Sequence, residues 1–351
     1  MTISSTRFVN ATPRSARIVL AVFVLAVLGL LVVALRPESG PTGVVGGKGD
    51  LAVYAEVVTQ LKSGEPYYQA LHQELLANDY GTASVFNWRP PFYLTLVSWF
   101  PGAVWAQLAL AATALVTAGM AVALVARGGS QPMAIAMAVL LAAALLSAVV
   151  PRAEVVMELT AGVLTLLSVS AYGLKLPWLG FAAALLALFC REIAGVYVAV
   201  CVGFALSERR WAEVGAWIAG LAGFAIYYGW HIETVMSLLG PADQSYPDSW
   251  VQFGGAGFVL SATSFNGLFA LLPLWVTALL LPLAVVGMLA APAAWIARVL
   301  ATVLAYVLVF AVFGKAVNFY WGALYAPLLA FGLVWAWPAL RDLGRRAMSP
   351  A

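Results

Sequence analysis

The chain has 351 residues, of which 63% are hydrophobic and 9% are charged, and its formal net charge is +3. Soluble domains carry about 25% charged residues, so this composition excludes a soluble globular protein, and its hydrophobicity excludes a disordered chain. Two cysteines also exclude a disulfide-rich secreted scaffold. The composition predicts an all-α polytopic membrane protein, with one transmembrane domain over residues 1–351.

The apolar runs of the sequence predict where the chain crosses the membrane. A transmembrane helix needs about 20 apolar residues. The first run, 18–35, follows three arginines and lacks a small-residue cleavage site, so it is interpreted as an uncleaved anchor. Residues 92–100 are expected to form a short piece at the membrane face. Further spans are predicted at about 103–126, 132–150, 156–174, 211–230, 267–290, 294–313 and 319–337.

The stretch 177–206 allows two interpretations, because Arg191 and Glu192 stand near its centre. It forms either one crossing or two short helices that meet at this charged pair. Two helices give about ten spans, with both termini on one side. That side then carries 11 of the 18 basic residues and only three acidic ones, as the positive-inside rule requires of the cytoplasmic side. We therefore predict ten spans in a bacterial-type cytoplasmic membrane, with both termini cytoplasmic.

Two long loops, 36–91 and 231–266, fall on the extracytoplasmic side of this topology, and the other side has short connections. Function concentrates in loops held by a rigid scaffold, so we expect the active site on the outer face. The first loop contains an amphipathic pattern that predicts a helix resting on the membrane surface, and Asp50 would occupy its N-cap position. The apolar positions of this helix are Leu51, Val53, Val57, Val58 and Leu61.

Several charged residues could serve either structure or chemistry. Arg89 lies among aromatic residues and prolines, and it could be an interfacial anchor or an anion contact. The Arg191–Glu192 pair at membrane depth indicates a cavity or pathway, or an ion pair that holds a helix break. Glu154 and Glu158 could form a metal or acceptor site, although a solvated helix end is the favoured interpretation.

Other signals are weaker or missing. Lys315 begins a polar and aromatic segment that runs through Asn318 and Tyr320, and His231 is interpreted as interfacial. Residues 46–50 are rich in glycine but do not match a phosphate-binding loop. The sequence lacks H-E-x-x-H, G-x-S-x-G, D-x-D and CxxC motifs, so zinc protease, serine hydrolase and redox functions have no support.

Several segments together resemble the GT-C superfamily of polytopic membrane glycosyltransferases. They are Asp50-x-x-x-Tyr54, 61–67 (LKSGEPY), 89–93 (RPPFY), 188–192 (LFCRE), 208–211 (ERRW) and 318–329 (NFYWGALYAPLL). The sequence departs from some mannosyltransferase relatives, because Glu158-Leu-Thr160 stands where those carry a Gly-Gln-x-Asn element. Mannose transfer is therefore not assigned.

The resemblance implies an inverting transfer on the outer face, from a polyprenyl-phosphate-linked sugar to a hydroxyl of a lipid or glycan acceptor. Asp50 would be the general base, and Arg89, Arg191 and Lys315 would bind the donor phosphate. No metal, cofactor or nucleic acid is expected, and the remaining partners are membrane lipids. Supporting roles fall to Tyr54, Glu158, Glu192, Asn318, Tyr320 and His231.

The main alternative is a polytopic transporter or flippase for a lipid or solute. Arg191, Glu192 and Lys315 would then line a pathway. Transporters often contain inverted repeats with broken helices at matching positions, and the sequence shows no convincing repeat. A polymerase or ligase of lipid-linked glycans would require a larger outer loop rich in Arg and His.

Overall fold

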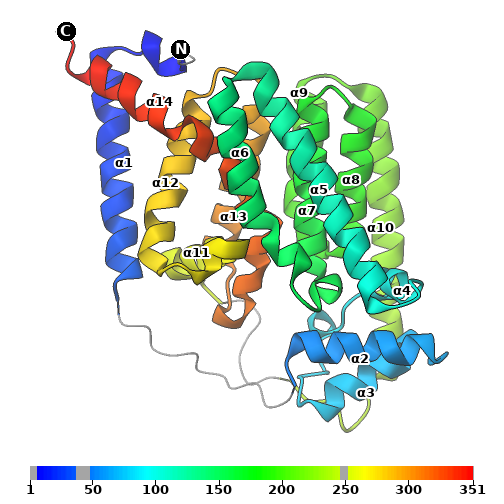
Figure 1. Cartoon of the computed structure of the whole chain (residues 1–351). Coiled ribbons are helices and arrows are strands. Elements are labelled where there is room, and N and C mark those ends of the chain that lie inside the picture. The colour runs from blue at the N-terminus through cyan, green and yellow to red at the C-terminus, as the bar shows by residue number, and fades with distance from the viewer. Residues whose placement is uncertain (1–5, 37–47, 246–251, 351) are drawn as a thin grey trace.

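The computed structural model describes residues 6–36, 48–245 and 252–350, and these residues form helices and turns without any β-strand (Figure 1). The predicted all-α class is therefore confirmed. By length and composition, three of the described helical segments could cross a membrane: α1 (Pro13–Ala34), α5 (Ala103–Gly128) and Gln131–Val149, which joins α6 (Gln131–Ala144) to a short 3-10 helix. A fourth would be the pair Ala316–Leu324 and Ala326–Ala347, bent by 50°, if it counts as one span.

Shorter apolar helices complete the bundle. They are α7 (Met157–Gly173), α8 (Pro177–Cys190), α9 (Gly195–Ser207), α12 (Leu274–Ala290) and α13 (Ile296–Val312), together with the longer α10 (Trp211–Leu238). The last helix, α14 (Leu329–Ala347), follows the 3-10 helix η7 (Ala316–Leu324). The segment 231–266 contains the end of α10 and the separate helix α11 (Gly255–Ser264).

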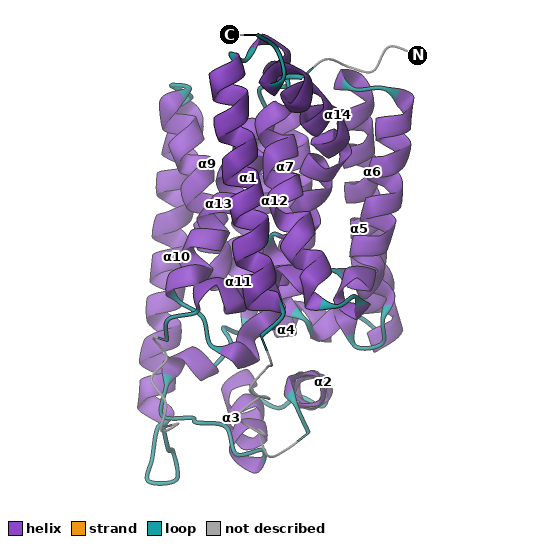
Figure 2. Cartoon of the chain, turned by 90° about the vertical axis from the view of Figure 1, so that its left-hand side faces the viewer, coloured by secondary structure: helices purple, strands orange, loops and turns teal. Residues whose placement is uncertain are grey.

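The two ends of the bundle differ in what they carry. The N- and C-terminal segments lie together at one end (Figure 1), where Thr6 donates to Asp342 from its backbone N–H and its hydroxyl. At the opposite end, α2 (Asp50–Lys62) and α3 (Tyr67–Ala77) lie beneath the bundle (Figures 1 and 2). We call the segment 50–91, which contains both helices, the outer layer. The short helix α4 (Phe92–Ser98) leads from this layer back toward the bundle.

The stretch 177–206 is broken at the charged pair, as the two-helix interpretation predicted. Helix α8 ends at Cys190 because Arg191 has extended backbone angles, and a single 3-10 turn over Glu192–Ala194 precedes α9. Helices α8 and α9 contact each other. The break therefore holds Arg191 and Glu192 between two packed helices.

The apolar face of α2 packs on protein rather than on a membrane surface. Val53, Val57 and Val58 are buried, and α2 contacts α3 and α4. Leu51 is 44% exposed, so it lies outside this buried stripe. The amphipathic pattern correctly predicted the helix, but its apolar residues anchor an outer layer to the bundle.

Small residues allow backbones to approach closely where the bundle meets η7. A Cβ atom added to Gly162 of α7 would lie 1.9 Å from the carbonyl oxygen of Ala323. A Cβ atom on Gly322 would lie 1.6 Å from the carbonyl oxygen of Ala262 in α11. Close packing through glycine is a usual means of helix association in membranes. These contacts fix the position of η7 relative to two neighbouring helices, α7 and α11.

We expect Gly162→Ala to displace η7 and to lower stability by about 1–3 kcal/mol, the usual range for overpacking. Thermal unfolding in detergent measures the effect. Gly119→Ala in α5 is the matched control, because no atom lies within 4 Å of the added Cβ. Equal melting temperatures for Gly162→Ala and the control would contradict the close contact.

Candidate functional site

Asp50 is the first residue of α2, and its side chain faces two phenols. The N-cap position predicted for Asp50 belongs instead to Gly49, whose φ of +79° favours glycine, and no side-chain cap bond forms there. Tyr80 donates a close hydrogen bond to Asp50 Oδ1. The Tyr320 hydroxyl lies 3.3 Å from Oδ2. The carboxylate therefore binds side chains from two distant segments rather than capping its own helix.

Arg89 places a buried cation beside this carboxylate. Its side chain donates to the Phe86 carbonyl at 3.2 Å and to the Tyr320 hydroxyl at 3.4 Å, and its guanidinium carbon lies 6.0 Å from the centre of the Tyr54 ring. Arg89 is 7% exposed, and its buried Nε has no hydrogen-bond partner. Within the described part of the chain, no carboxylate lies within ion-pair distance of Arg89. The guanidinium thus retains capacity for an anion.

The backbone around Arg89 is held firmly. Its carbonyl accepts a 2.7 Å hydrogen bond from the Tyr67 hydroxyl of α3. Two prolines follow Arg89, and α4 begins directly after them. Burial disfavours the charge on Arg89, but the side chains of Tyr54 and Tyr320 oppose this effect, and the Arg89 pKa stays above its ordinary value.

Arg191 is also buried, but its charge is balanced. Its Nε lies 2.6 Å from Glu158 Oε1, and its Nη1 pairs closely with Glu192. Arg191 is 2% exposed and Glu158 is 5% exposed. The favoured interpretation of Glu154 and Glu158 as a solvated helix end is therefore wrong, since Glu154 is only 4% exposed. Glu158 instead ties α7 to the α8–α9 break.

The structure brings five of the ten predicted site residues together at the α2 end of the bundle. We use the name base–cation cluster for Asp50, Tyr54, Tyr80, Arg89, Asn318 and Tyr320, which are joined by the contacts above and by a 3.4 Å contact from the Tyr320 hydroxyl to Asn318 Oδ1. The Arg191 ion pairs lie near enough to act electrostatically on Arg89 and Tyr54. Tyr80 was missed, because an isolated tyrosine after a turn carries no sequence signal.

Lys315 and His231 are two further predicted residues. Lys315 precedes η7, where its carbonyl accepts the Asn318 N–H at 2.8 Å. His231 of α10 shares a 3.0 Å hydrogen bond between its Nδ1 and the Tyr68 hydroxyl of α3. His231 therefore connects the outer layer to the bundle.

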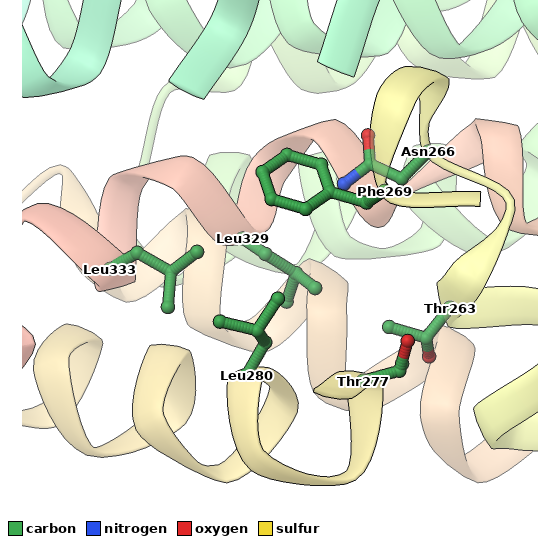
Figure 3. Close-up of a pocket in the computed structure, with 7 residues that line it drawn as sticks. All are labelled: Thr263, Asn266, Phe269, Thr277, Leu280, Leu329 and Leu333. Atoms are coloured by element: carbon green, nitrogen blue, oxygen red, sulfur yellow. The ribbon is translucent and has the colours of Figure 1, made fainter. Parts of the chain in front are cut away.

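A pocket lies elsewhere, between α11, α12 and α14 (Figure 3). Its lining includes no member of the base–cation cluster. Asn266 donates from Nδ2 to the Ala326 carbonyl at 3.2 Å, and its Oδ1 has no hydrogen-bond partner. The lining residues are Thr263, Asn266, Phe269, Thr277, Leu280, Leu329 and Leu333.

We use the name latch for the polar contacts that join the outer layer to the segment after α10. His72 of α3 lies 2.7 Å from Asp243, between its Nε2 and the carboxylate Oδ1, and the Ala83 N–H donates to the Gln244 carbonyl at 3.2 Å. Burial of the Asp243 carboxylate raises its pKa, but hydrogen bonds from the Gly240 N–H and His72 outweigh this effect and leave the pKa below its ordinary value.

Arg191→Leu alone should cost more than Arg191→Leu combined with Glu158→Leu, because the single substitution leaves the buried Glu158 carboxylate unpaired. We expect a loss of about 3–5 kcal/mol for Arg191→Leu and a smaller loss for the double variant. Glu158→Leu should also cost less than Arg191→Leu, because Arg191 keeps its ion pair with Glu192. Chemical unfolding in detergent measures the free energy of unfolding of the wild type, the two single variants and the double variant. Additive losses would show that the pair is not coupled.

The His72–Asp243 contact of the latch should weaken in acid. A lowered folded-state pKa means that Asp243 stabilises the latch above about pH 4, its ordinary range, and that this stabilisation is lost as the pH falls through the lowered value. We expect amide-exchange protection of α3 to fall below about pH 4, while that of α13 persists. Asp243→Asn should remove this pH dependence. A pH-independent α3 in the wild type would contradict the latch.

Comparison of the chain with protein-family models, with curated proteins and with solved structures finds no match.

Proposed function

We propose that the chain is a GT-C-like membrane glycosyltransferase that moves a sugar from a polyprenyl-phosphate donor to an acceptor hydroxyl. One observation carries the proposal: Tyr320 connects the Asp50 carboxylate to Arg89, a buried cation that has no acidic partner among the described residues. Transfer from a phosphate-linked donor needs both a base for the attacking hydroxyl and positive charge at the departing phosphate. The cluster supplies these two groups side by side.

The reaction follows from the roles of these groups. Asp50 accepts the proton of the acceptor hydroxyl, and the acceptor oxygen forms a bond to the anomeric carbon of the donor sugar. The bond from that carbon to the phosphate oxygen breaks on the opposite face, so the configuration inverts. The phosphate leaves with the electron pair, and Arg89 stabilises the negative charge that develops on it.

The three candidate cations have different roles in this proposal. Arg191 is already paired with two carboxylates, so it has less capacity for a phosphate than Arg89. We assign Arg89 as the main phosphate ligand. Arg191 holds the α8–α9 break beside it, and Lys315 stands at the entrance to η7 as an additional cation.

The proposed topology places the cluster outside the cytoplasm. The helix break at Arg191 and the joined termini support ten crossings, with both termini at the basic, cytoplasmic end. An extracytoplasmic site has no supply of nucleotide sugars, and a lipid-linked donor reaches it through the bilayer. The acceptor is a lipid or glycan hydroxyl, and Glu158, Glu192 and His231 support the site from the surrounding helices.

The test is sugar transfer by the purified protein from a panel of polyprenyl-phosphate sugars, with product mass as readout. We expect Asp50→Asn to lower kcat about a hundredfold or more with an unchanged melting temperature, because general-base catalysis contributes on that order. Glu65→Gln, an exposed acid of the same outer segment, is the matched control. Arg89→Gln should lower kcat as well as raise the donor KM, because Arg89 stabilises the charge that develops on the departing phosphate.

Full activity of Asp50→Asn would contradict the base assignment. Absence of transfer from every donor, together with substrate flux in liposomes that depends on Arg191, would instead establish the transporter.

A further inference from the structure

The two oxygens of the Asp50 carboxylate are held unequally. Tyr80 donates a close hydrogen bond to Oδ1, whereas the Tyr320 oxygen lies 3.3 Å from Oδ2. Hydrogen bonds between a hydroxyl and an oxygen have their usual length near 2.7–2.8 Å and weaken as they lengthen. Tyr80 therefore anchors Oδ1, and Oδ2 is the more loosely held oxygen.

The Tyr320 hydroxyl has two acceptors for its single hydrogen. It lies 3.3 Å from Asp50 Oδ2 and 3.4 Å from Asn318 Oδ1, and it also accepts from Arg89 Nη2 at 3.4 Å. A hydroxyl donates one hydrogen at a time. When Tyr320 turns its hydrogen toward Asn318, Oδ2 has a lone pair available for another donor. Asn318 is buried, so it offers this alternative at a fixed position.

We infer that Tyr80 is a positioning residue for the general base, and that Oδ2 of Asp50 is the oxygen that receives the acceptor proton. This inference rests on the proposed function. As the acceptor O–H bond breaks, its proton moves to Oδ2 and the acceptor oxygen bonds to the anomeric carbon. The phosphate departs with the electron pair of the broken sugar–oxygen bond. Tyr320 meanwhile donates to Asn318, and Tyr80 keeps its hydrogen bond to Oδ1.

Other ionisable groups lie around the carboxylate. Tyr80 is distinct because its hydroxyl bonds to Oδ1, whereas Tyr320 contacts Oδ2 and Arg89. Among the described residues these groups include Tyr54 of α2, Tyr80, Arg89, Glu158, Arg191, Tyr320 and the exposed neighbours Lys48 and Asp79.

The first test measures the protonation of Asp50 without requiring transfer activity. A carbodiimide reacts with protonated carboxyl groups, and mass spectrometry of the Asp50 peptide gives the midpoint pH of labelling. We expect Tyr80→Phe to raise this midpoint by about half to one pH unit, because a hydrogen bond donated to a carboxylate favours its ionised form. Tyr320→Phe should cause a smaller rise.

A second variant changes the same hydrogen bond in the opposite direction. Replacement of Tyr80 by 3-fluorotyrosine makes the phenol more acidic and a stronger donor, so the midpoint should fall. Tyr197→Phe is the matched control and should cause no shift, since its hydroxyl bonds to Ser168 at 2.7 Å. An unchanged midpoint in both Tyr80 variants, or a larger rise for Tyr320→Phe, would overturn the inference.

Kinetics then separate the two tyrosines. Tyr80→Phe should lower kcat about tenfold, leave the donor KM within twofold and shift the acid limb of the pH profile upward. Tyr320→Phe should also raise the donor KM, because it contacts Arg89. If the wild type transfers no sugar, the proposed function fails while labelling still decides the role of Tyr80. Transfer with unshifted labelling and kinetics in Tyr80→Phe would refute the positioning role alone.

Discussion

The cost of burying charge in an apolar bundle governs how this protein is built. An isolated ion at membrane depth is strongly unfavourable, so such residues pair with each other or line cavities. Arg191 meets this requirement with two carboxylates, one from α7 and one from the adjacent 3-10 turn. The ion pairs therefore hold the ends of α8 and α9 in place and stabilise the chain break between them. Arg89 differs, since no carboxylate among the described residues balances it.

Segments far apart in the sequence meet at the base–cation cluster. The N-terminal outer layer supplies Asp50, Tyr80 and Arg89, and the C-terminal η7 supplies Asn318 and Tyr320. The position of η7 depends on glycine contacts with α7 and α11, and the position of the outer layer depends on the buried face of α2. The geometry of the cluster is thus set by packing on both sides of it.

Hydropathy and helix signals predicted much of this architecture. The all-α class, the helix that begins at Asp50, and the break at Arg191 all follow from apolar periodicity and from charges within it. Burial was harder to predict, because a one-dimensional pattern does not show whether a face meets lipid or protein. The α2 stripe and Glu158 were both misjudged for this reason. Tyr80 required the fold, since its contact with Asp50 spans 30 positions.

The position of α1 has a consequence for biosynthesis. Ala16 is its only buried residue within Pro13–Ala34, and its neighbours in the bundle, α11, α12 and α14, all come from the last third of the chain. Because synthesis proceeds from the N-terminus, α1 is made before any of these three helices. Thr6, which precedes α1, bonds to Asp342 of α14, so the contacts that hold the N-terminal segment in place form only after the last helix has been made.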